Sequence, residues 1–427
     1  MKSSVVVGLG KIGLPLAVQV AEAKRRVIGV DINPQVVELV NQGLEPFPGE
    51  EDLSRRLMDA VESGSLQATV DATEAARGAS EIMIVVPLYV DELGIPDFSG
   101  IDSATKAVGR GLRSGTLVSY ETTVPVGTTR NRFAKILEAE SGLVAGSDFS
   151  LVFSPERVLT GRVFADLRRY PKLLGGTTVN CGQRGTDFYS SILTFDERTD
   201  LPKPNGVWNL GTCEAAELAK LAETTYRDVN IALANEFSRF ASRNAIDFRV
   251  VVEACNSQYF SHIHRPGIAV GGHCLPVYSQ MYLWNDPTAT VVRAARETNR
   301  SMPEHCIRLL ETAHGPLAGQ NVLILGASYR GDVKETSFSG VFDVVNALTV
   351  RKARCWVSDP YFTSEELEQL GLPIRGNPKE VEAIVIQADH AEYRTYKFSD
   401  HPVLRTVLNG RGIELRGMET PIKIVHL

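Results

Sequence analysis

The chain has 427 residues, which at roughly 150 residues per domain suggests about three domains and excludes a single small binding module. With 43% hydrophobic and 22% charged residues and no low-complexity period, the composition is that of a globular protein. The formal net charge of −6 argues against a broad nucleic-acid-binding surface, so we expect any phosphate site to be local.

The sequence contains no candidate membrane span and no candidate leader. Its longest strongly apolar run, 82–90, is less than half the length of a membrane span and contains Pro87. Strand-like sequence begins at Ser4, which leaves no room for a secretory signal. The six cysteines are scattered without a Cys-x-x-Cys pair, so neither a disulfide framework nor a zinc ribbon is indicated. We therefore expect a cytoplasmic protein with no membrane partner.

The N-terminus has the pattern of a dinucleotide-binding unit. A strand-like run at 4–7 leads into Gly8-Leu9-Gly10-Lys11-Ile12-Gly13 and then into a helical pattern. Small residues there permit a tight turn and close approach of backbone to a pyrophosphate. Asp31 ends the next strand, close to the ~20 residues downstream expected for a carboxylate that holds the ribose 2′-hydroxyl, and favours NAD over NADP. The candidate cofactor-binding residues are Gly8, Gly10, Lys11, Ile12, Gly13, Asp31 and, from a later loop, Thr123.

Strand and helix patterns alternate twice along the chain, which is typical of α/β proteins with parallel sheets. The first series, with apolar runs such as 82–86 and 151–153, ends near Leu201, where prolines follow. A second series begins after Pro316. The sequence therefore predicts two Rossmann-like doubly wound parallel-sheet domains joined by a central helical domain. The predicted boundaries are 1–201 for NAD binding, 202–314 for the central domain and 315–427 for a second sheet domain of nucleotide-binding size.

One long helix is predicted in the central region. Residues 213–244 contain no proline or glycine, and their apolar residues recur at helical spacing. At 1.5 Å per residue the helix would be roughly 48 Å long, which exceeds the need of a single domain. We therefore expect it to bridge two domains and to form the interface of a homodimer.

The segment from Pro266 to Pro276 places Cys274 in a glycine-rich loop, including Gly271 and Gly272. Backbone can approach a ligand there, and amide groups can stabilise a thiolate, so we interpret Cys274 as a nucleophile. The alternative is a metal site formed by His262, His264, His273 and Cys274. That spacing fits no closed zinc pattern, and convergence of the four groups cannot be shown from sequence.

Three further segments carry polar residues whose interpretation from the residues alone stays open. Lys220 and Thr224 share one face of the long helix, as a solvated polar stripe also would. The loop around Thr123 follows a strand, at the sheet edge where ligands of α/β proteins bind. Glu156 in Ser154-Pro155-Glu156-Arg157-Val158 has either an acid/base role or the simpler role of starting a helix.

Together these segments resemble the UDP-glucose/GDP-mannose dehydrogenase family over nearly the whole chain. The resemblance rests on the N-terminal glycine motif and on four later motifs that occur in the family's order. Gly-Gly-His-Cys at 271–274 is more similar to the branch that acts on UDP-N-acetylhexosamines than to the UDP-glucose branch. The four later motifs are Thr122-Thr123-Val124-Pro125-Val126-Gly127-Thr128-Thr129, Ser154-Pro155-Glu156-Arg157-Val158, Ala216-Glu217-Leu218-Ala219-Lys220-Leu221 and Gly271-Gly272-His273-Cys274.

The resemblance implies a four-electron oxidation of a sugar C6 hydroxyl to a carboxylate, with NAD as the acceptor and a nucleotide-diphosphate sugar as the substrate. Cys274 would carry a thiohemiacetal and then a thioester. Lys220 would stabilise the alkoxide-like oxygen or act with a water held by Thr123, and Glu156 would be the acid/base partner. Tyr329-Arg330 would contact the diphosphate. The implied catalytic set is Cys274, Lys220, Glu156, Thr123 and Thr224, and the implied substrate-binding set is Glu156, Lys220, Gly271, Tyr329 and Arg330, with no metal.

Three positions depart from the family pattern. Thr224 replaces an asparagine, Tyr278 an aspartate and Ser337 an arginine that reaches the cofactor. They motivate a second hypothesis, a nucleotide-sugar-binding regulatory protein whose altered site has lost oxidation. A third hypothesis, a dehydrogenase of simple β-hydroxy acids, explains neither Cys274 nor a second α/β domain. The sequence leaves the base and the sugar unidentified, with a UDP-N-acetylhexosamine favoured over UDP- or dTDP-hexoses.

Overall fold

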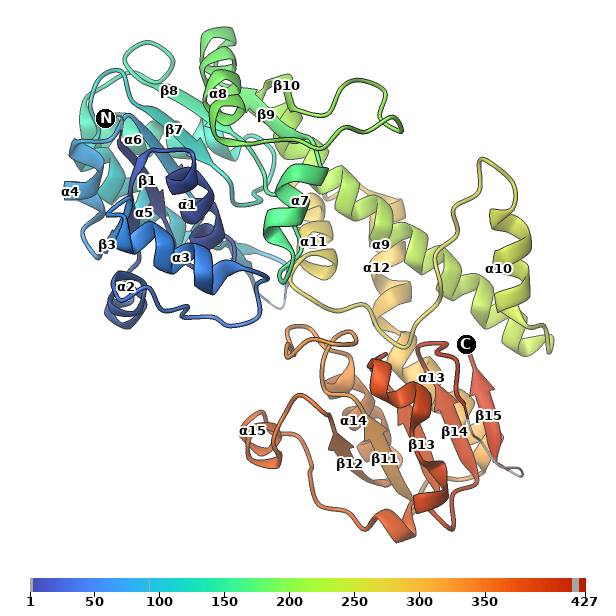
Figure 1. Ribbon diagram of the computed structural model, residues 1–427. Coiled ribbons are helices and arrows are strands. Elements are labelled where there is room, and N and C mark those ends of the chain that lie inside the picture. The colour runs from blue at the N-terminus through green and yellow to red at the C-terminus, as the bar shows by residue number, and fades with distance from the viewer. Residues whose placement is uncertain (1–2, 92, 417–421) are drawn as a thin grey trace. The chain divides into compact units, whose positions relative to one another are not determined.

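The computed structural model describes residues 3–91, 93–416 and 422–427, which form two compact units (Figure 1). The N-terminal unit is Met1–Ala222 and the C-terminal unit is Glu223–Leu427. Both contain a mainly parallel sheet with helices, so the predicted α/β class is confirmed. The three domain boundaries stay predictions.

The sheet of the N-terminal unit has the strand order β10-β9-β8-β7-β4-β1-β2-β3 within the described residues. Strands β1, β2, β3, β4, β7 and β8 are parallel, as predicted, whereas β9 runs antiparallel to β8 and β10 runs parallel to β9. The strands are β1 (Ser3–Val7), β2 (Arg26–Val30), β3 (Leu66–Thr69), β4 (Glu81–Ile84), β7 (Leu117–Tyr120), β8 (Ser150–Phe153), β9 (Lys172–Gly176) and β10 (Val207–Thr212), with a separate antiparallel pair, β5 (Tyr89–Val90) and β6 (Pro96–Asp97).

Helices pack on this sheet because its strands are apolar on both faces. On one face a continuous core joins the sheet to α1, α3, α7 and α8. On the other, the buried ring of Tyr120 stacks on Phe133, with 4.1 Å between ring centroids, and its hydroxyl hydrogen-bonds Thr105. The helical segments are α1 (Gly13–Glu22), α2 (Pro34–Asn41), α3 (Leu53–Glu62), α4 (Ala72–Arg77), α5 (Ser99–Gly111), η1 (Thr129–Phe133), α6 (Ala134–Ser141), α7 (Val163–Arg169) and α8 (Val179–Ile192).

The predicted long helix is present as α9 (Cys213–Arg243), and the boundary between the two units falls within it. In the C-terminal unit, α9 packs on α10 (Phe248–Asn256) through Ala234, Ala241, Phe248 and Val252. The remaining helices of this region are α11 (Leu275–Asn285), α12 (Thr290–Arg300) and α13 (Met302–His314).

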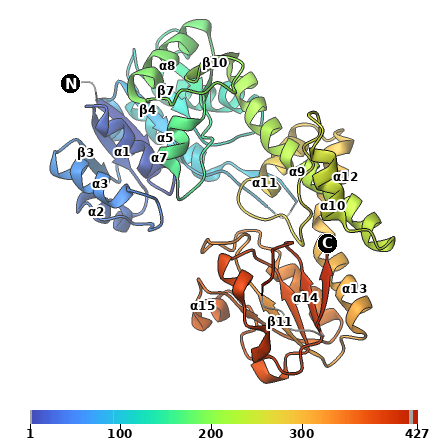
Figure 2. The same ribbon diagram turned by 45° about the vertical axis from the view of Figure 1, so that its right-hand side comes forward.

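The sheet of the C-terminal unit has the order β12-β11-β13-β14-β15 and is parallel throughout the described residues (Figure 1). Figure 2 shows α13 and α14 beside the same sheet. Alternation along β11 explains its two covered faces, since Val322 and Ile324 join the core under α13 and α14, whereas Leu323 and Leu325 join the core on the opposite face. The elements are β11 (Asn321–Leu325), α14 (Val341–Val350), β12 (Arg354–Ser358), α15 (Ser364–Gln369), η2 (Pro378–Glu380), β13 (Ala383–Ile386), η3 (Ala391–Thr395), η4 (Phe398–Asp400), β14 (Thr406–Asn409) and β15 (Lys423–His426).

Candidate functional site

The parallel strands of the N-terminal unit bring three predicted loops to one edge of the sheet. Strands β8, β7, β4 and β1 are neighbours, so the segments after their carboxyl ends lie along the same edge. These segments are the glycine loop after β1, the loop of Thr122 and Thr123 after β7, and the loop of Glu156 after β8. Alignment of parallel strands thus gathers residues that are far apart in the sequence.

The glycine loop fits the pyrophosphate of NAD. Gly8 has a φ of +96°, and a Cβ at Gly13 would lie 1.8 Å from the Gly8 carbonyl oxygen, so both positions require glycine. A Cβ at Gly10 would meet nothing within 4 Å, which is the open space that a ligand needs. Within the described residues no side chain caps the start of α1, so its N-terminus is available to an anion.

Asp31 lies beside this loop at the end of β2. One carboxylate oxygen accepts a hydrogen bond from the Leu9 amide at 2.9 Å, and the other accepts one from the Asn33 amide at 2.9 Å. The side chain is thereby held in place, and a carboxylate oxygen retains lone pairs for a ribose hydroxyl. When bound at this edge, NAD supplies the hydride acceptor.

The threonine loop is anchored to α9 by a buried carboxylate. Glu217 accepts hydrogen bonds from the amides of Gly127, at 2.6 Å, and Thr129, at 2.9 Å. Burial raises the pKa of Glu217 to about 7, although these amide donors act in the opposite direction. In the same loop, Thr122 donates to the Val86 carbonyl at 2.7 Å, and Thr123 is buried. Glu217 therefore couples the position of Thr123 to the helix that carries Lys220.

Lys220 and Glu156, predicted to act together, are in contact. The ammonium group of Lys220 donates a hydrogen bond to the main-chain carbonyl of Glu156 at 2.7 Å. The carboxylate of Glu156 is paired instead with Lys172, the first residue of β9, which also pairs with Glu121. Lys220 is only 8% exposed. This placement argues against a merely solvated polar stripe on this part of α9.

The two glutamates of this cluster have pKa values shifted in opposite directions. Burial is the largest influence on both and favours the neutral form. For Glu121 it prevails over the attraction of Lys172 and raises the pKa to about 8. For Glu156, Lys172, a hydrogen bond from Glu121 and the charge of Lys220 outweigh burial and lower the pKa. At neutral pH the cluster therefore holds one protonated and one ionised glutamate.

In the C-terminal unit, Cys274 is exposed and occupies the N-cap position of α11. The start of a helix favours negative charge, which suits a thiolate nucleophile. The loop before it packs tightly, since a Cβ at Gly271 would lie 2.5 Å from the Phe338 carbonyl oxygen and a Cβ at Gly272 would lie 2.8 Å from the Tyr329 ring. The glycines are thus required for contact with the segment that carries Tyr329 and Arg330.

Arg411 connects the same segments and was not anticipated from the sequence. Its guanidinium donates to the carbonyls of Ala269 at 3.0 Å, Tyr329 at 2.8 Å and Gln387 at 2.6 Å. Burial lowers the pKa of Arg411. One side chain therefore joins the cysteine loop, the Tyr329 segment and the end of β13. The only signal in the sequence is its position just after a strand, which many surface arginines share.

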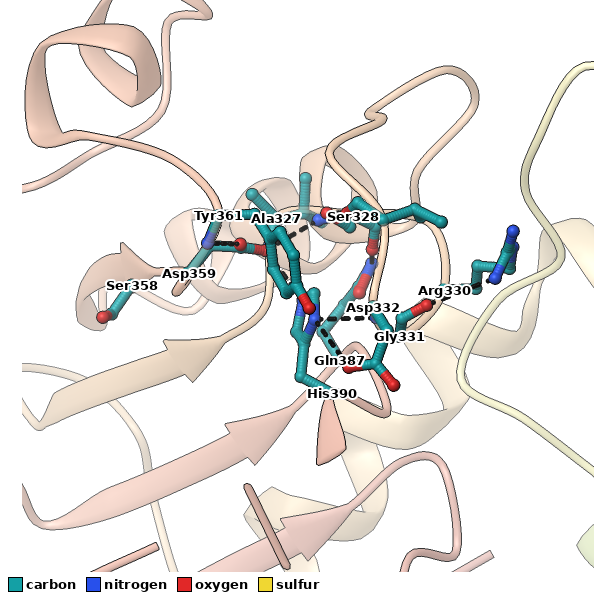
Figure 3. Close-up of polar contacts among 12 residues, drawn as sticks. Ala327, Ser328, Arg330, Gly331, Asp332, Ser358, Asp359, Tyr361, Gln387 and His390 are labelled. Atoms are coloured by element: carbon teal, nitrogen blue, oxygen red, sulfur yellow. Dashed lines mark hydrogen bonds and ion pairs between the residues drawn. The ribbon is translucent and has the colours of Figure 1, made fainter. Parts of the chain in front are cut away.

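A buried carboxylate, Asp359, holds the loop that presents Arg330 (Figure 3). It accepts hydrogen bonds from the amides of Ala327 at 2.7 Å and Ser328 at 3.1 Å. It also contacts Nε2 of the fully buried His390 at 3.1 Å, while Nδ1 of His390 accepts from the Asp332 amide at 3.0 Å. His390 is therefore a neutral ring that donates to Asp359, and Arg330 extends away from the cluster (Figure 3).

The three positions that depart from the family pattern lie in ordered surroundings. Thr224 is buried on α9. The amide of Tyr278 donates to the Cys274 carbonyl at 2.9 Å, within α11. The hydroxyl of Ser337 donates to Glu335 at 2.6 Å, and its carbonyl accepts from the Gly272 amide at 2.9 Å. Ser337 thus supports the cysteine loop instead of supplying a long cationic side chain.

Two classes of site or segment are absent from the described part of the chain. It contains no group of three or more His, Cys, Asp and Glu side chains able to hold a metal ion. None of the helices in those same ranges combines the length and apolarity that a membrane span needs.

Comparison with known proteins gives matches over most of the chain. Three models of the UDP-glucose/GDP-mannose dehydrogenase family match: its NAD binding domain at residues 2–193, its central domain at 214–301 and its UDP binding domain at 323–411. A UDP-N-acetyl-D-mannosamine dehydrogenase of Pyrococcus horikoshii is 34% identical over 401 residues, which cover 91% of this chain and 90% of that protein. An NDP-N-acetyl-D-galactosaminuronic acid dehydrogenase of Ralstonia solanacearum is 30% identical over 420 residues, covering 96% and 95%.

The fold comparison agrees. The structure of the UDP-D-ManNAc dehydrogenase from Pyrococcus horikoshii matches with a TM-score of 0.88 and 29% identity, over 99% of this chain and 98% of that one. Together with the glycine loop, these matches define an NAD-dependent oxidoreductase. More particularly, the chain belongs to the UDP-glucose/GDP-mannose dehydrogenase family and is a nucleotide-sugar dehydrogenase, which confirms the family and cofactor predicted from the sequence.

The different surroundings of Gly10 and Gly13 generate a prediction. Gly10→Ala places a methyl group in open space, so the protein should keep its stability while the KM for NAD rises by about tenfold or more. Gly13→Ala drives a methyl group into the Gly8 carbonyl and should also lower the thermal midpoint. Thermal melts and NAD titration of initial rates measure both effects. Unchanged NAD dependence in the Gly10 variant would contradict the assignment.

A second prediction concerns Asp359. Although burial favours its neutral form, the hydrogen bond from His390 and the amide donors lower its pKa below the ordinary 3.8. Its ionisation therefore adds stability above that value, which is lost as the pH falls through the lower, folded-state pKa. Asp359→Asn should reduce the free energy of unfolding by about 1–3 kcal/mol at pH 7 and by less at pH 3. Urea unfolding at both pH values tests this, with exposed Asp400→Asn as the control, and equal losses at both would contradict it.

Proposed function

We propose that this enzyme oxidises the C6 hydroxyl of a UDP-N-acetylhexosamine to a carboxylate in two successive NAD-dependent steps. The Gly-Gly-His-Cys sequence at 271–274 and the substrates in the names of the similar dehydrogenases support this substrate over UDP- or dTDP-glucose. The observation that carries the proposal is the exposed Cys274 at the start of α11, on a loop packed against the Tyr329 segment. A buried sulfur would be unable to receive the sugar.

In the proposed first step the C6 alcohol loses a proton and a hydride to become an aldehyde. Lys220 stabilises the alkoxide-like oxygen, and water held by Thr123 passes the proton to the ionised carboxylate of Glu156, the acid/base partner, which releases it to solvent before the second step. In the structure Lys220 is directed by its hydrogen bond to the Glu156 carbonyl. NAD held by the glycine loop and Asp31 would supply the hydride acceptor. Thr224, one turn after Lys220 and buried beside it on α9, would shape the same wall of the site.

In the proposed second step the Cys274 sulfur bonds to the aldehyde carbon, giving a thiohemiacetal. Loss of a second hydride and a proton converts it to a thioester, which water then hydrolyses to the carboxylate and the free thiol. Glu156, kept ionised by Lys172, would accept a proton from that water. Gly271 brings the loop close to the sugar, and Tyr329 and Arg330 hold the diphosphate.

This mechanism predicts that two NADH form for each sugar consumed. Cys274→Ser should yield no uronate, because the second oxidation acts on the thiohemiacetal that this sulfur forms. Cys255→Ser, which alters a half-buried cysteine of α10, should keep both the two NADH and the uronate. NADH absorbance and chromatography of the sugar products measure this across UDP-, dTDP- and GDP-hexoses. One NADH per sugar, or full uronate production by the Cys274 variant, would contradict the mechanism. No NADH with any sugar would favour the regulatory binding protein.

We also propose that the enzyme is a homodimer formed through α9. Four large apolar side chains on α9 are 42–59% exposed and recur at intervals that place them on one helical stripe. A contiguous stripe of exposed large apolar side chains is typical of a protein interface. The four residues are Tyr226, Leu233, Phe237 and Phe240.

The dimer proposal predicts a mass of twice 46.7 kDa in light scattering at micromolar concentration. Leu233→Glu should shift the protein to a monomer, because a charge in an apolar interface is costly to desolvate. Val291→Glu alters a more exposed valine on α12 and should leave the mass unchanged. A monomeric wild type, or a dimeric Leu233 variant, would contradict the proposal.

We further propose a cytoplasmic enzyme of polysaccharide biosynthesis, divided as the sequence indicated into domains at 1–201, 202–314 and 315–427. All six cysteines are free thiols, which is typical of a reducing compartment. A nucleotide-activated uronate is a suitable donor for a glycosyltransferase, because the diphosphate remains as the leaving group.

A further inference from the structure

Lys172 is a buried cation for which the proposed mechanism has no direct role. Its side chain is 4% exposed, and it pairs with Glu121, which is fully buried, and with Glu156, which is 11% exposed. It also donates to the Ser154 carbonyl at 3.3 Å. A lysine is rarely buried unless it is fully paired. This one pairs with residues of the two loops after β7 and β8 and lies 4.8 Å from the centre of the Tyr189 ring on α8.

The direction of β9 explains how Lys172 reaches this edge. Because β9 is antiparallel to β8, with Phe153 opposite Gly175, its first residue lies at the carboxyl end of β8. A parallel β9 would place Lys172 at the opposite edge of the sheet. The reversed strand thus delivers a cation to the edge where the Thr123 and Glu156 loops meet.

We propose that Lys172 is a positioning residue for the oxidation: its charge pairs with the Glu156 carboxylate and holds the Glu156 carbonyl where Lys220 donates to it. The inference rests on the proposed roles of Lys220 and Glu156. Lys172 touches neither cofactor nor substrate in this account and acts only through these two residues.

The charged and titratable groups around Glu156 come from four elements. Lys172 lies on β9, Lys220 on α9, Glu121 after β7 and Tyr189 on α8, and each interacts with the Glu156 carboxylate. Tyr189 donates to Glu121 and is itself hydrogen-bonded to Ser119 at 2.6 Å. With Glu121 protonated, the positive charge of Lys172 balances the negative charge of Glu156, and Lys220 adds a second positive charge beside the pair.

Removal of the Lys172 charge therefore has a predictable effect on the pH profile. Without the cation, burial is opposed only by Glu121 and Lys220, so the pKa of Glu156 rises. As the pH is lowered, the variant should then lose the activity that needs ionised Glu156 at a higher pH than the wild type does. In the wild type, ionisation of Glu121 near pH 8 adds a second buried negative charge that competes with Glu156 for Lys172. The rate should therefore fall on the alkaline side of the profile as well.

The test is the pH dependence of the first NADH formed in a single turnover. This step precedes the thioester, so its outcome is separate from that of the Cys274 test. Lys172→Met should slow the first hydride transfer at least about tenfold at pH 7 and move the acid limb upward by about one unit or more. Lys172→Arg, which keeps the charge, should retain the wild-type position of the acid limb.

A matched control and a second variant separate an effect on the pH profile from an effect on folding. Arg25→Met removes another buried cation, paired with Glu81 at 2.9 Å at the amino ends of the strands, and should lower stability without moving the pH profile. If Lys172→Met does not fold, Glu121→Gln tests the proposal instead. It should abolish the fall in rate near pH 8, because glutamine cannot ionise. A folded Lys172→Met protein with unshifted limbs, or a Glu121→Gln profile identical to the wild type, would overturn the proposal.

Discussion

The site depends on one kind of interaction, a buried or half-buried side chain that hydrogen-bonds to the main chain of a loop. Glu217 accepts hydrogen bonds from amides of the threonine loop, Asp31 from the glycine loop and Asp359 from the loop of Arg330. Arg411 does the same for the cysteine loop with a guanidinium. Loops are ordinarily the mobile parts of a fold, and buried polar atoms are costly unless paired. Each pairing therefore fixes a loop in the one position where the buried group is satisfied.

The same principle accounts for the charge distribution of the candidate site. Lys172, Glu121 and Glu156 are buried together, and the cluster is stable because one cation serves one ionised carboxylate while the second stays protonated. A site that must handle protons near neutral pH benefits from groups whose pKa values are moved apart by their surroundings. In this fold the separation arises from burial and from a single lysine.

Much of the architecture was predictable because it follows from local patterns. The glycine motif, the long helix from Cys213 and the second α/β region each leave a periodic or spacing signal, and the structure contains all three. The glycine motif and Asp31 indicated the cofactor for the same reason, since such a turn needs glycine at particular positions, and Gly13 is tightly packed against Gly8.

The parts that were missed depend on contacts between distant segments. Lys172 reaches Glu156 only because β9 is reversed, and no pattern in the sequence indicates that reversal. Glu217 was noted as part of a motif, but its hydrogen bonds to Gly127 and Thr129 cross about ninety residues of chain and leave no periodic signal. Arg411 binds three carbonyls that lie far apart in the sequence. The roles of Cys274 and Lys220 stay predictions, supported by exposure and contact.

The most direct test of the proposed chemistry is to catch the sugar on the enzyme. Reaction of enzyme, NAD and substrate is quenched with acid within one turnover, and the peptides are then analysed by mass spectrometry. The account predicts a thioester-linked nucleotide-sugar adduct on the peptide that contains Cys274. Uronate formation with no adduct on any cysteine, or with the adduct on a different cysteine, would contradict it.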